Sequence, residues 1–383
     1  MSMTTIPFKA CALTSRRFLL PAQRLLFKEM SFPMQQNFGN FSLFRRQSNG
    51  AFDPITLLVQ RASDILSSSP HLLAFVRQLK VGSMYWEEGW EALRDLLCTF
   101  RPAKIVCFTM EGALQAMPSD VCVALTGIFA QSSLQKVVLW GWDDIPPSTL
   151  TAAFASCQNV VVRCHTLEMA TAMDAASPAS KQDTNTCLSP AIDAGDGATP
   201  LECLVMEVEN GAGDFLLQPT ISRLIRGLRE LEIFPDALPA AHFCSTTLTH
   251  LALHMPWGLG SAVFPCLGVL KVLTLKNTPT RGWSIPMEIV APSLPTSLPR
   301  LEVLNVNTSI DGGRMGRAPA LDAALTALAF LREVNLTIDG TVSAMWDEVE
   351  LMYRKSVEEE LPAVHAAGLV TFSQTERDST QAY

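Results

Sequence analysis

Apolar residues recur along the chain in a short pattern that predicts β-strands. Each copy has an apolar residue, two variable residues and then an apolar–variable–apolar triplet. Both apolar residues of the triplet point to one face of a strand, because successive side chains of a strand alternate between its faces. Copies of the pattern begin at Val76, Leu134, Leu201, Leu228, Leu248, Leu270, Leu301 and Leu331, and weaker copies lie around Ile105, Val160 and Val370.

The segments between these strands contain apolar residues at helical spacing. Three stripes with steps of three or four residues predict helices: Ile55, Leu58, Ala62 and Ile65; Trp86, Trp90, Leu93 and Leu97; and Trp346, Val349, Tyr353, Val357 and Leu361. A single strand–helix unit cannot bury its apolar face, so such units stack on one another. The predicted fold class is therefore α/β, an irregular leucine-rich-repeat-type solenoid with parallel strands and outer helices. An ordinary α/β domain with parallel strands is the alternative.

Composition along the chain predicts the domain boundaries. We expect a partial helical unit at residues 1–30, a linker at 31–53 and the solenoid at 54–373. Residues 168–200 are rich in Ala, Ser, Thr, Asp and Pro, which predicts a disordered insertion between repeats. Residues 374–383 are expected to form a disordered polar tail.

Composition and charge narrow the class of protein. Of the 383 residues, 48% are hydrophobic and only 17% are charged, which is ample for a large core. The ten cysteines lack Cys-x-x-Cys spacing and are scattered in apolar stretches, so we expect a reduced protein of the cytoplasm or nucleus. The first fifty residues are basic although the net charge is −8. The rest of the chain is therefore strongly acidic and disfavours binding to phosphate backbones.

No familiar catalytic motif is present in the sequence. Phosphate-binding loops, nucleophile elbows, His-Glu-x-x-His and dinucleotide-binding glycine patterns are absent. His250 and His254 are a close pair, but they flank a strand triplet, where roughly 13 Å of backbone separates them. One metal ion could not bridge that distance, so we predict neither a metal site nor a cofactor. A binding protein is favoured over an enzyme of unrecognised type.

The variable positions of the strands define a candidate binding face. If the triplets are strands, these side chains point away from the core and form a contiguous polar patch on the open side of the sheet. Such a patch predicts a protein partner, since it has few basic residues for a nucleic acid and no apolar stripe for a membrane. The alternatives are a merely solvated face or one covered by residues 168–200. The candidate residues are Glu232, His250, His254, Lys271, Thr274, Lys276, Asn305, Asn307, Asn335 and Thr337.

The N-terminal segment Phe8–Phe27 has a motif of its own. It contains Cys11-Ala-Leu13-Thr-Ser-Arg, then Phe18 and Pro21, and closes with Leu25, Leu26 and Phe27. This motif resembles the second half of an F-box, as found in fungal F-box proteins with leucine-rich-repeat-like bodies. The Leu-Pro turn and first helix of that family have only Thr5-Ile-Pro as a counterpart, so the resemblance is to an N-terminally truncated F-box.

The resemblance implies a role in ubiquitin transfer. In that family the F-box docks on the Skp adaptor of a cullin-type ubiquitin ligase, and the repeat body recognises the substrate while other subunits perform the chemistry. The residues implied to contact the adaptor are Cys11, Leu13, Phe18, Pro21, Leu25 and Phe27. A stand-alone repeat scaffold without a ligase role is the alternative. The same segment could instead be a helix that covers the end of the solenoid, or a mitochondrial presequence.

Overall fold

The computed structural model describes residues 16–32, 54–82, 90–112, 117–167, 200–255, 263–277, 291–309, 319–339, 351, 354–355, 357–359 and 361–375. The chain divides into two compact units, residues 1–201 and residues 202–383. Nearly all of the predicted insertion at 168–200, most of the predicted linker and nearly all of the predicted tail lie outside the described residues. Most of the third predicted helix lies outside them as well.

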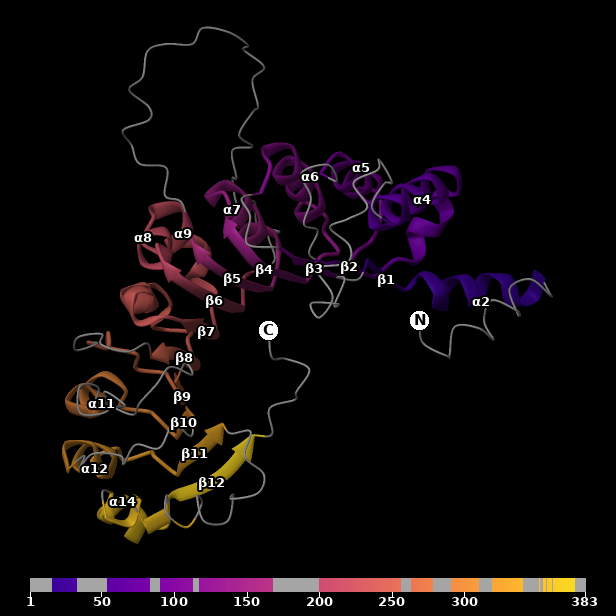
Figure 1. Cartoon of the computed structure of the whole chain (residues 1–383). Helices are drawn as coiled ribbons and strands as arrows, with labels where there is room; N and C mark the ends of the chain where they lie inside the picture. The colour runs from indigo at the N-terminus through magenta and orange to yellow at the C-terminus, as the bar shows by residue number, and fades with distance from the viewer. Residues whose placement is uncertain are drawn as a thin grey trace, which may run out of the picture. The chain divides into compact units, whose positions relative to one another are not determined.

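Unit 1 (residues 1–201) contains a sheet whose strands are all parallel and lie in chain order. Most of its helices stack as neighbours on one face of that sheet, and the first helix lies beside the first strand (Figure 1). The strands are β1 (Glu29–Phe32), β2 (Gln78–Val81), β3 (Cys107–Glu111), β4 (Lys136–Asp144) and β5 (Asn159–Thr166). The helices are α2 (Arg16–Phe27), α4 (Pro54–Ser68), the 3-10 helix η2 (Pro70–Phe75), α5 (Trp90–Thr99), α6 (Ser119–Phe129) and α7 (Pro147–Ser156).

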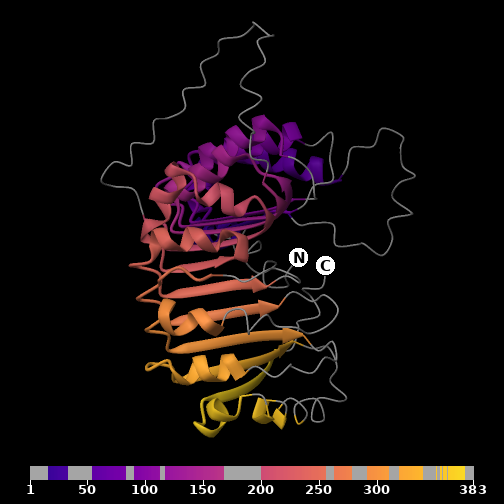
Figure 2. The same ribbon diagram turned by 90° about the vertical axis from the view of Figure 1, so that its left-hand side faces the viewer.

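Unit 2 (residues 202–383) repeats this arrangement with more strands and shorter helices. Figure 2 shows its strands running side by side in chain order, and every described pairing is parallel. The strands are β6 (Cys203–Asn210), β7 (Glu230–Ile233), β8 (His250–Met255), β9 (Val272–Asn277), β10 (Val303–Ser309), β11 (Glu333–Asp339) and β12 (Val370–Thr375). The helices are α8 (Ala212–Leu216), α9 (Pro219–Leu224), η4 (Ile225–Gly227), η5 (Pro235–Cys244), η6 (Ala291–Ser293), α11 (Leu294–Ser297), α12 (Pro319–Thr326) and α14 (Pro362–Ala366).

The predicted α/β fold with parallel strands and outer helices is confirmed. Each triplet lies in a strand, and the triplets stand in register, as with Leu231 beside Leu251 and Leu273 beside Leu304. All four of these leucines are buried. Each removes apolar surface from water, which stabilises the fold by about 1.5–3 kcal/mol per side chain.

Several helices start at a proline, including α4, α7, α9, α12 and α14. Proline suits the first turn because its fixed φ matches the helix and its missing N–H would have no partner there. The apolar spacing predicted α4 and the part of α5 from Trp90 onward, whereas Trp86 of the predicted stripe lies outside the described residues. In α4, however, the buried stripe passes through Val59 and Leu66, whereas Ile65 is exposed.

The sheet of unit 1 begins earlier in the chain than residue 54, where the sequence places the first repeat. Residues Glu29–Phe32 form β1, which pairs in parallel with β2. Phe32 is buried, and Lys80 of β2 forms an ion pair of 2.8 Å with Glu29. The segment Phe27-Lys-Glu-Met30-Ser-Phe32 has the full spacing of the repeat pattern, so the signal for this strand was present in the sequence. The prediction instead divided these residues between the F-box-like segment and the linker.

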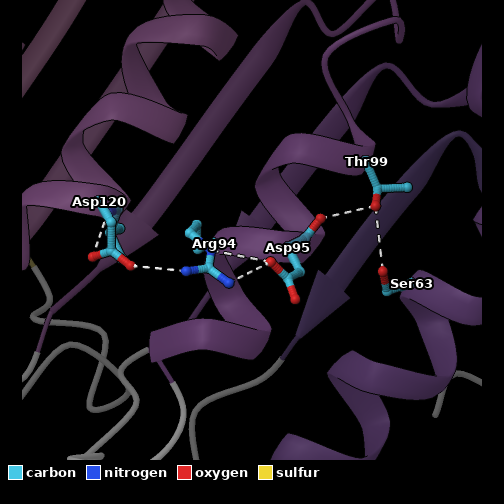
Figure 3. Close-up of polar contacts among 6 residues, drawn as sticks. Ser63, Arg94, Asp95, Thr99 and Asp120 are labelled. Atoms are coloured by element: carbon cyan, nitrogen blue, oxygen red, sulfur yellow. Dashed lines mark hydrogen bonds and ion pairs between the residues drawn. The ribbon is translucent and has the colours of Figure 1, made fainter. Parts of the chain in front are cut away.

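Polar contacts connect successive helices of unit 1 (Figure 3). Arg94 of α5 lies between Asp95, at 2.9 Å, and Asp120 of α6, at 3.5 Å. On the other side of α5, the Thr99 hydroxyl lies 3.3 Å from the Ser63 hydroxyl of α4. These contacts are largely solvated, so they align the helices more than they stabilise them.

Candidate functional site

Figure 1 shows the described helices of unit 2 on one face of β6–β12. The candidate residues within the strands alternate with the buried core leucines, which places them on the opposite face, here called the open face. Strand register arranges most of them in two adjacent rows. The first row contains Glu232, Thr274, Asn305 and Asn335, and the second contains His254, Lys276, Asn307 and Thr337. The patch is therefore contiguous, as the spacing of parallel strands requires.

Two candidate residues lie away from these rows. His250 is exposed at the start of β8, where its Nδ1 atom lies 2.9 Å from the Thr249 hydroxyl. Lys271 precedes β9 and forms an ion pair of 3.3 Å with Glu302, which also contacts Arg332. Lys271 thus belongs to a charged cluster at the N-terminal ends of the strands, not to the middle of the open face.

A ladder of side-chain hydrogen bonds crosses the open face from β9 to β12. Asn305 donates from Nδ2 to the Thr274 hydroxyl at 3.1 Å, and Asn335 donates from Nδ2 to Asn305 Oδ1 at 2.9 Å. The Thr371 hydroxyl donates to Asn335 Oδ1. Each amide nitrogen has a second N–H, so the ladder can present donors at the spacing of the strands. These residues are held rigidly, which lowers the entropy lost on binding.

A compact charged cluster occupies the β6–β9 part of the open face. The Glu232 carboxylate accepts hydrogen bonds from His254 Nε2, at 2.6 Å, and from the Lys276 ammonium. The Glu207 carboxylate of β6 lies 3.7 Å from the same His254 nitrogen. The His254 ring also packs against Phe234, with ring centroids 5.1 Å apart.

Glu232 is ionised within this cluster. Burial opposes its ionisation, but the hydrogen bonds from His254 and Lys276 outweigh burial and lower the pKa of Glu232 to about 2. At neutral pH the cluster therefore contains a stable carboxylate with two nitrogen partners, in a setting where water is partly excluded.

The exposure of His254 differs from the expectation for a polar residue on an open face. Only 9% of His254 is exposed, because Phe234, Glu232 and Lys276 surround it. The sequence correctly separated His250 from His254, but it did not identify the partners of His254. Glu207 was missed altogether, since it lies 47 residues earlier and only strand pairing brings the two side chains together.

A shallow depression of about 120 Å³ adjoins this cluster on the open face. Its walls include Cys203, Glu230, Glu232, His250 and Thr274. This volume suits one side chain of a partner better than a whole cofactor, because ligand pockets usually measure about 300–1,000 Å³.

The structure describes the surroundings of only some of the F-box-like residues. Cys11 and Leu13 lie outside the described residues, and Phe18 lies in α2 without a described side chain. Pro21 and Leu25 are exposed on α2, whereas Phe27 is half-buried. Leu19 and Leu20 are also exposed, so α2 presents an apolar surface while it contacts η2 and β1.

Comparison with known proteins found no family model and no curated protein that matches this chain. Among the described residues, no helix is both long enough and apolar enough to cross a membrane.

Proposed function

We propose that this chain binds a protein partner through the open face of β6–β12. The observation that carries the proposal is the pair of polar rows on regular strands. The first row is hydrogen-bonded along its length from β9 to β12 by the Thr274–Asn305–Asn335–Thr371 ladder. Repeat proteins commonly bind partners on such sheets. Amide and hydroxyl groups suit a polar protein surface, and the carboxylates of Glu207, Glu230 and Glu232 disfavour nucleic acid on the same face.

The specific role that we propose is substrate recognition for a cullin-type ubiquitin ligase. Its support is α2, a helix in the F-box-like segment that exposes Leu19, Leu20 and Leu25. Exposed leucines on a helix are suited to an apolar groove on the Skp adaptor. The transfer chemistry would then belong to other subunits, and the repeat body would need no cofactor.

A stand-alone scaffold is the second candidate function. The contacts of α2 with η2 and β1 favour it, because a helix packed there covers the edge strand of the unit 1 sheet. In that case α2 would protect the edge strand, and its exposed leucines would contact no adaptor.

A binding measurement with purified Skp adaptor separates the two roles. Calorimetry of the full chain should detect the adaptor, and Leu20→Asp with Leu25→Asp should abolish the binding. Leu217→Asp is the matched control, since Leu217 is a similarly exposed leucine in unit 2. Absence of adaptor binding by the unmodified chain would favour the scaffold.

The open face is tested with partners that co-purify with the full chain from its host. Lys276 and Asn305 are bonded within the face, so their replacement would disturb the face itself. We choose His250→Glu with Asn307→Glu, which should remove the partners. Arg223→Glu with Arg226→Glu, on the helical side, should retain them. Loss of partners only in the helical-side variant would place binding on the helices.

A further inference from the structure

We propose that Glu207, Glu232 and His254 form a binding site for one divalent transition-metal ion of the Zn²⁺ type. The three residues come from consecutive strands, β6, β7 and β8. One carboxylate oxygen from each glutamate and one ring nitrogen of the histidine all lie within 4.8 Å of one another. Such a cluster differs from a solvated acidic patch, because it combines an imidazole with two carboxylates at a single point.

The distances suit a small ion. Bonds of about 2.0–2.2 Å from Zn²⁺ to nitrogen or oxygen place neighbouring ligand atoms of a tetrahedral site about 3.4 Å apart. His254 Nε2 and Glu207 Oε1 are already 3.7 Å apart. His254 Nε2 and Glu232 Oε1 are in direct hydrogen-bond contact at 2.6 Å. This second distance would have to increase by about 1 Å, which rotation of a glutamate side chain can provide.

The chemistry of the donors selects the class of ion. Imidazole suits Zn²⁺ and its transition-metal neighbours, whereas Ca²⁺ and Mg²⁺ prefer oxygen ligands and usually take six or more. Three protein ligands leave a fourth position of a tetrahedral ion for water or for a side chain of a partner.

The surroundings hold the donors in place. Phe234 packs against the His254 ring at 5.1 Å with an angle of 33° between the ring planes, which restricts the rotation of the imidazole. The site lies on strands and not on loops, and ligands on regular elements are positioned more accurately. His254 and Glu232 are also largely buried, which strengthens their attraction to a cation.

Lys276 is the competitor for this site. Its ammonium contacts Glu232 and supplies the cation that a metal ion would replace. About a third of the Lys276 side chain is exposed (32%), so the ammonium can turn into solvent when an ion binds. A divalent ion would balance both carboxylates, which a single ammonium cannot. Removal of Lys276 should therefore tighten metal binding and not weaken it.

The test uses the full chain after treatment with a chelator. Zn²⁺ binding is measured by calorimetry, and Co²⁺ is used as a probe because its visible absorption reports the ligand atoms. We expect one ion per chain. His254→Gln and Glu207→Gln should each weaken Zn²⁺ binding at least 10-fold, and Lys276→Met should strengthen it.

His250→Gln is the matched control, because His250 lies on the same strand and the same face, near Cys203 and Glu230. It should leave Zn²⁺ affinity unchanged. Thermal unfolding of each variant verifies the fold. Glu207 is more exposed than His254, so Glu207→Gln should disturb the fold less. If His254→Gln unfolds, the Zn²⁺ affinity of Glu207→Gln is therefore the test of the proposal.

Three results would overturn the proposal. They are no Zn²⁺ binding by the unmodified chain, an equal loss of affinity in His250→Gln, or a Co²⁺ spectrum with thiolate absorption. The last two would place the ion on surface residues such as His250, Cys203 or Cys266.

Discussion

The carboxylate of Asp322 in α12 accepts a hydrogen bond of 3.0 Å from the backbone N–H of Val364 in α14. It accepts a second one, of 3.1 Å, from the N–H of Ala363. Asp322 is buried, and the two N–H groups belong to the first turn of α14, which has no other partner for them within the helix. A single carboxylate thus attaches the last described helix to its neighbour.

We expect Asp322→Ala to lower the free energy of unfolding by about 1–3 kcal/mol, because it leaves buried backbone donors without an acceptor. Asp322→Asn should cost less, since its amide oxygen can still accept one bond. Urea unfolding measures both variants. An effect of Asp322→Ala below about 0.5 kcal/mol, the usual range for surface changes, would contradict this role.

The leucines of the unit 2 core should respond strongly to truncation. Leu251 is 1% exposed, and its neighbours in register are Leu231 and Leu273. Leu251→Ala should therefore cost about 2–5 kcal/mol, as for other buried leucines. Leu217→Ala is the control at an exposed site and should change stability by about 0.5 kcal/mol or less. Equal effects at the two positions would refute the packing described for β8.

Three glycines of different geometry form a graded test of backbone strain. Gly141 has φ +72°, and a Cβ there would lie 2.8 Å from the Gly112 carbonyl oxygen. Gly368 has φ +68° with open space, and Gly268 has open space with no such φ. Replacement by alanine should cost about 1–2 kcal/mol at Gly368, from φ alone. It should cost more at Gly141, where a steric clash is added, and about 0.5 kcal/mol or less at Gly268.

Chemical denaturation of the three variants should give this order. Gly141 lies where the register between β4 and β5 shifts, between Trp140 and Trp142, so its conformation shapes that irregularity. A variant Gly141→Ala as stable as Gly268→Ala would show that the strand relaxes without cost.

The cysteines should differ in reactivity. Burial raises the pKa of Cys157 and of Cys244 to about 12, far above the value of about 8.5 for a free thiol. The thiolate is the reactive form, so iodoacetamide at pH 8 should leave both unmodified in the folded chain. Among the cysteines in the described part of the chain, Cys266 is exposed and should be alkylated first. Mass spectrometry of peptides after brief labelling checks this order, and early labelling of Cys244 would contradict its burial.

The repeating triplets made most of the fold predictable. Leu204, Leu231, Leu251 and Leu304 each follow an apolar residue by three positions and precede another by two. This local pattern determines which side of a strand is apolar, whatever lies next to it. Most strands, their parallel arrangement and the core positions could therefore be predicted without coordinates, although β1 was not. The helices were predicted less accurately, as Ile65 shows, because a stripe shifted by one residue satisfies the same spacing.

The polar partners on the open face were decided only by the tertiary structure. Whether Glu207 meets His254 depends on how β6, β7 and β8 align, and alternation along each strand does not specify that alignment. The sequence placed Glu232, His254 and Lys276 on one face, but it could not show that Glu232 accepts bonds from both of the others. Whether a position faces the apolar core follows from the local alternation of residue types along one strand. A hydrogen-bonded cluster requires atoms from separate strands to come within about 3 Å, and only the register of the folded sheet sets those distances.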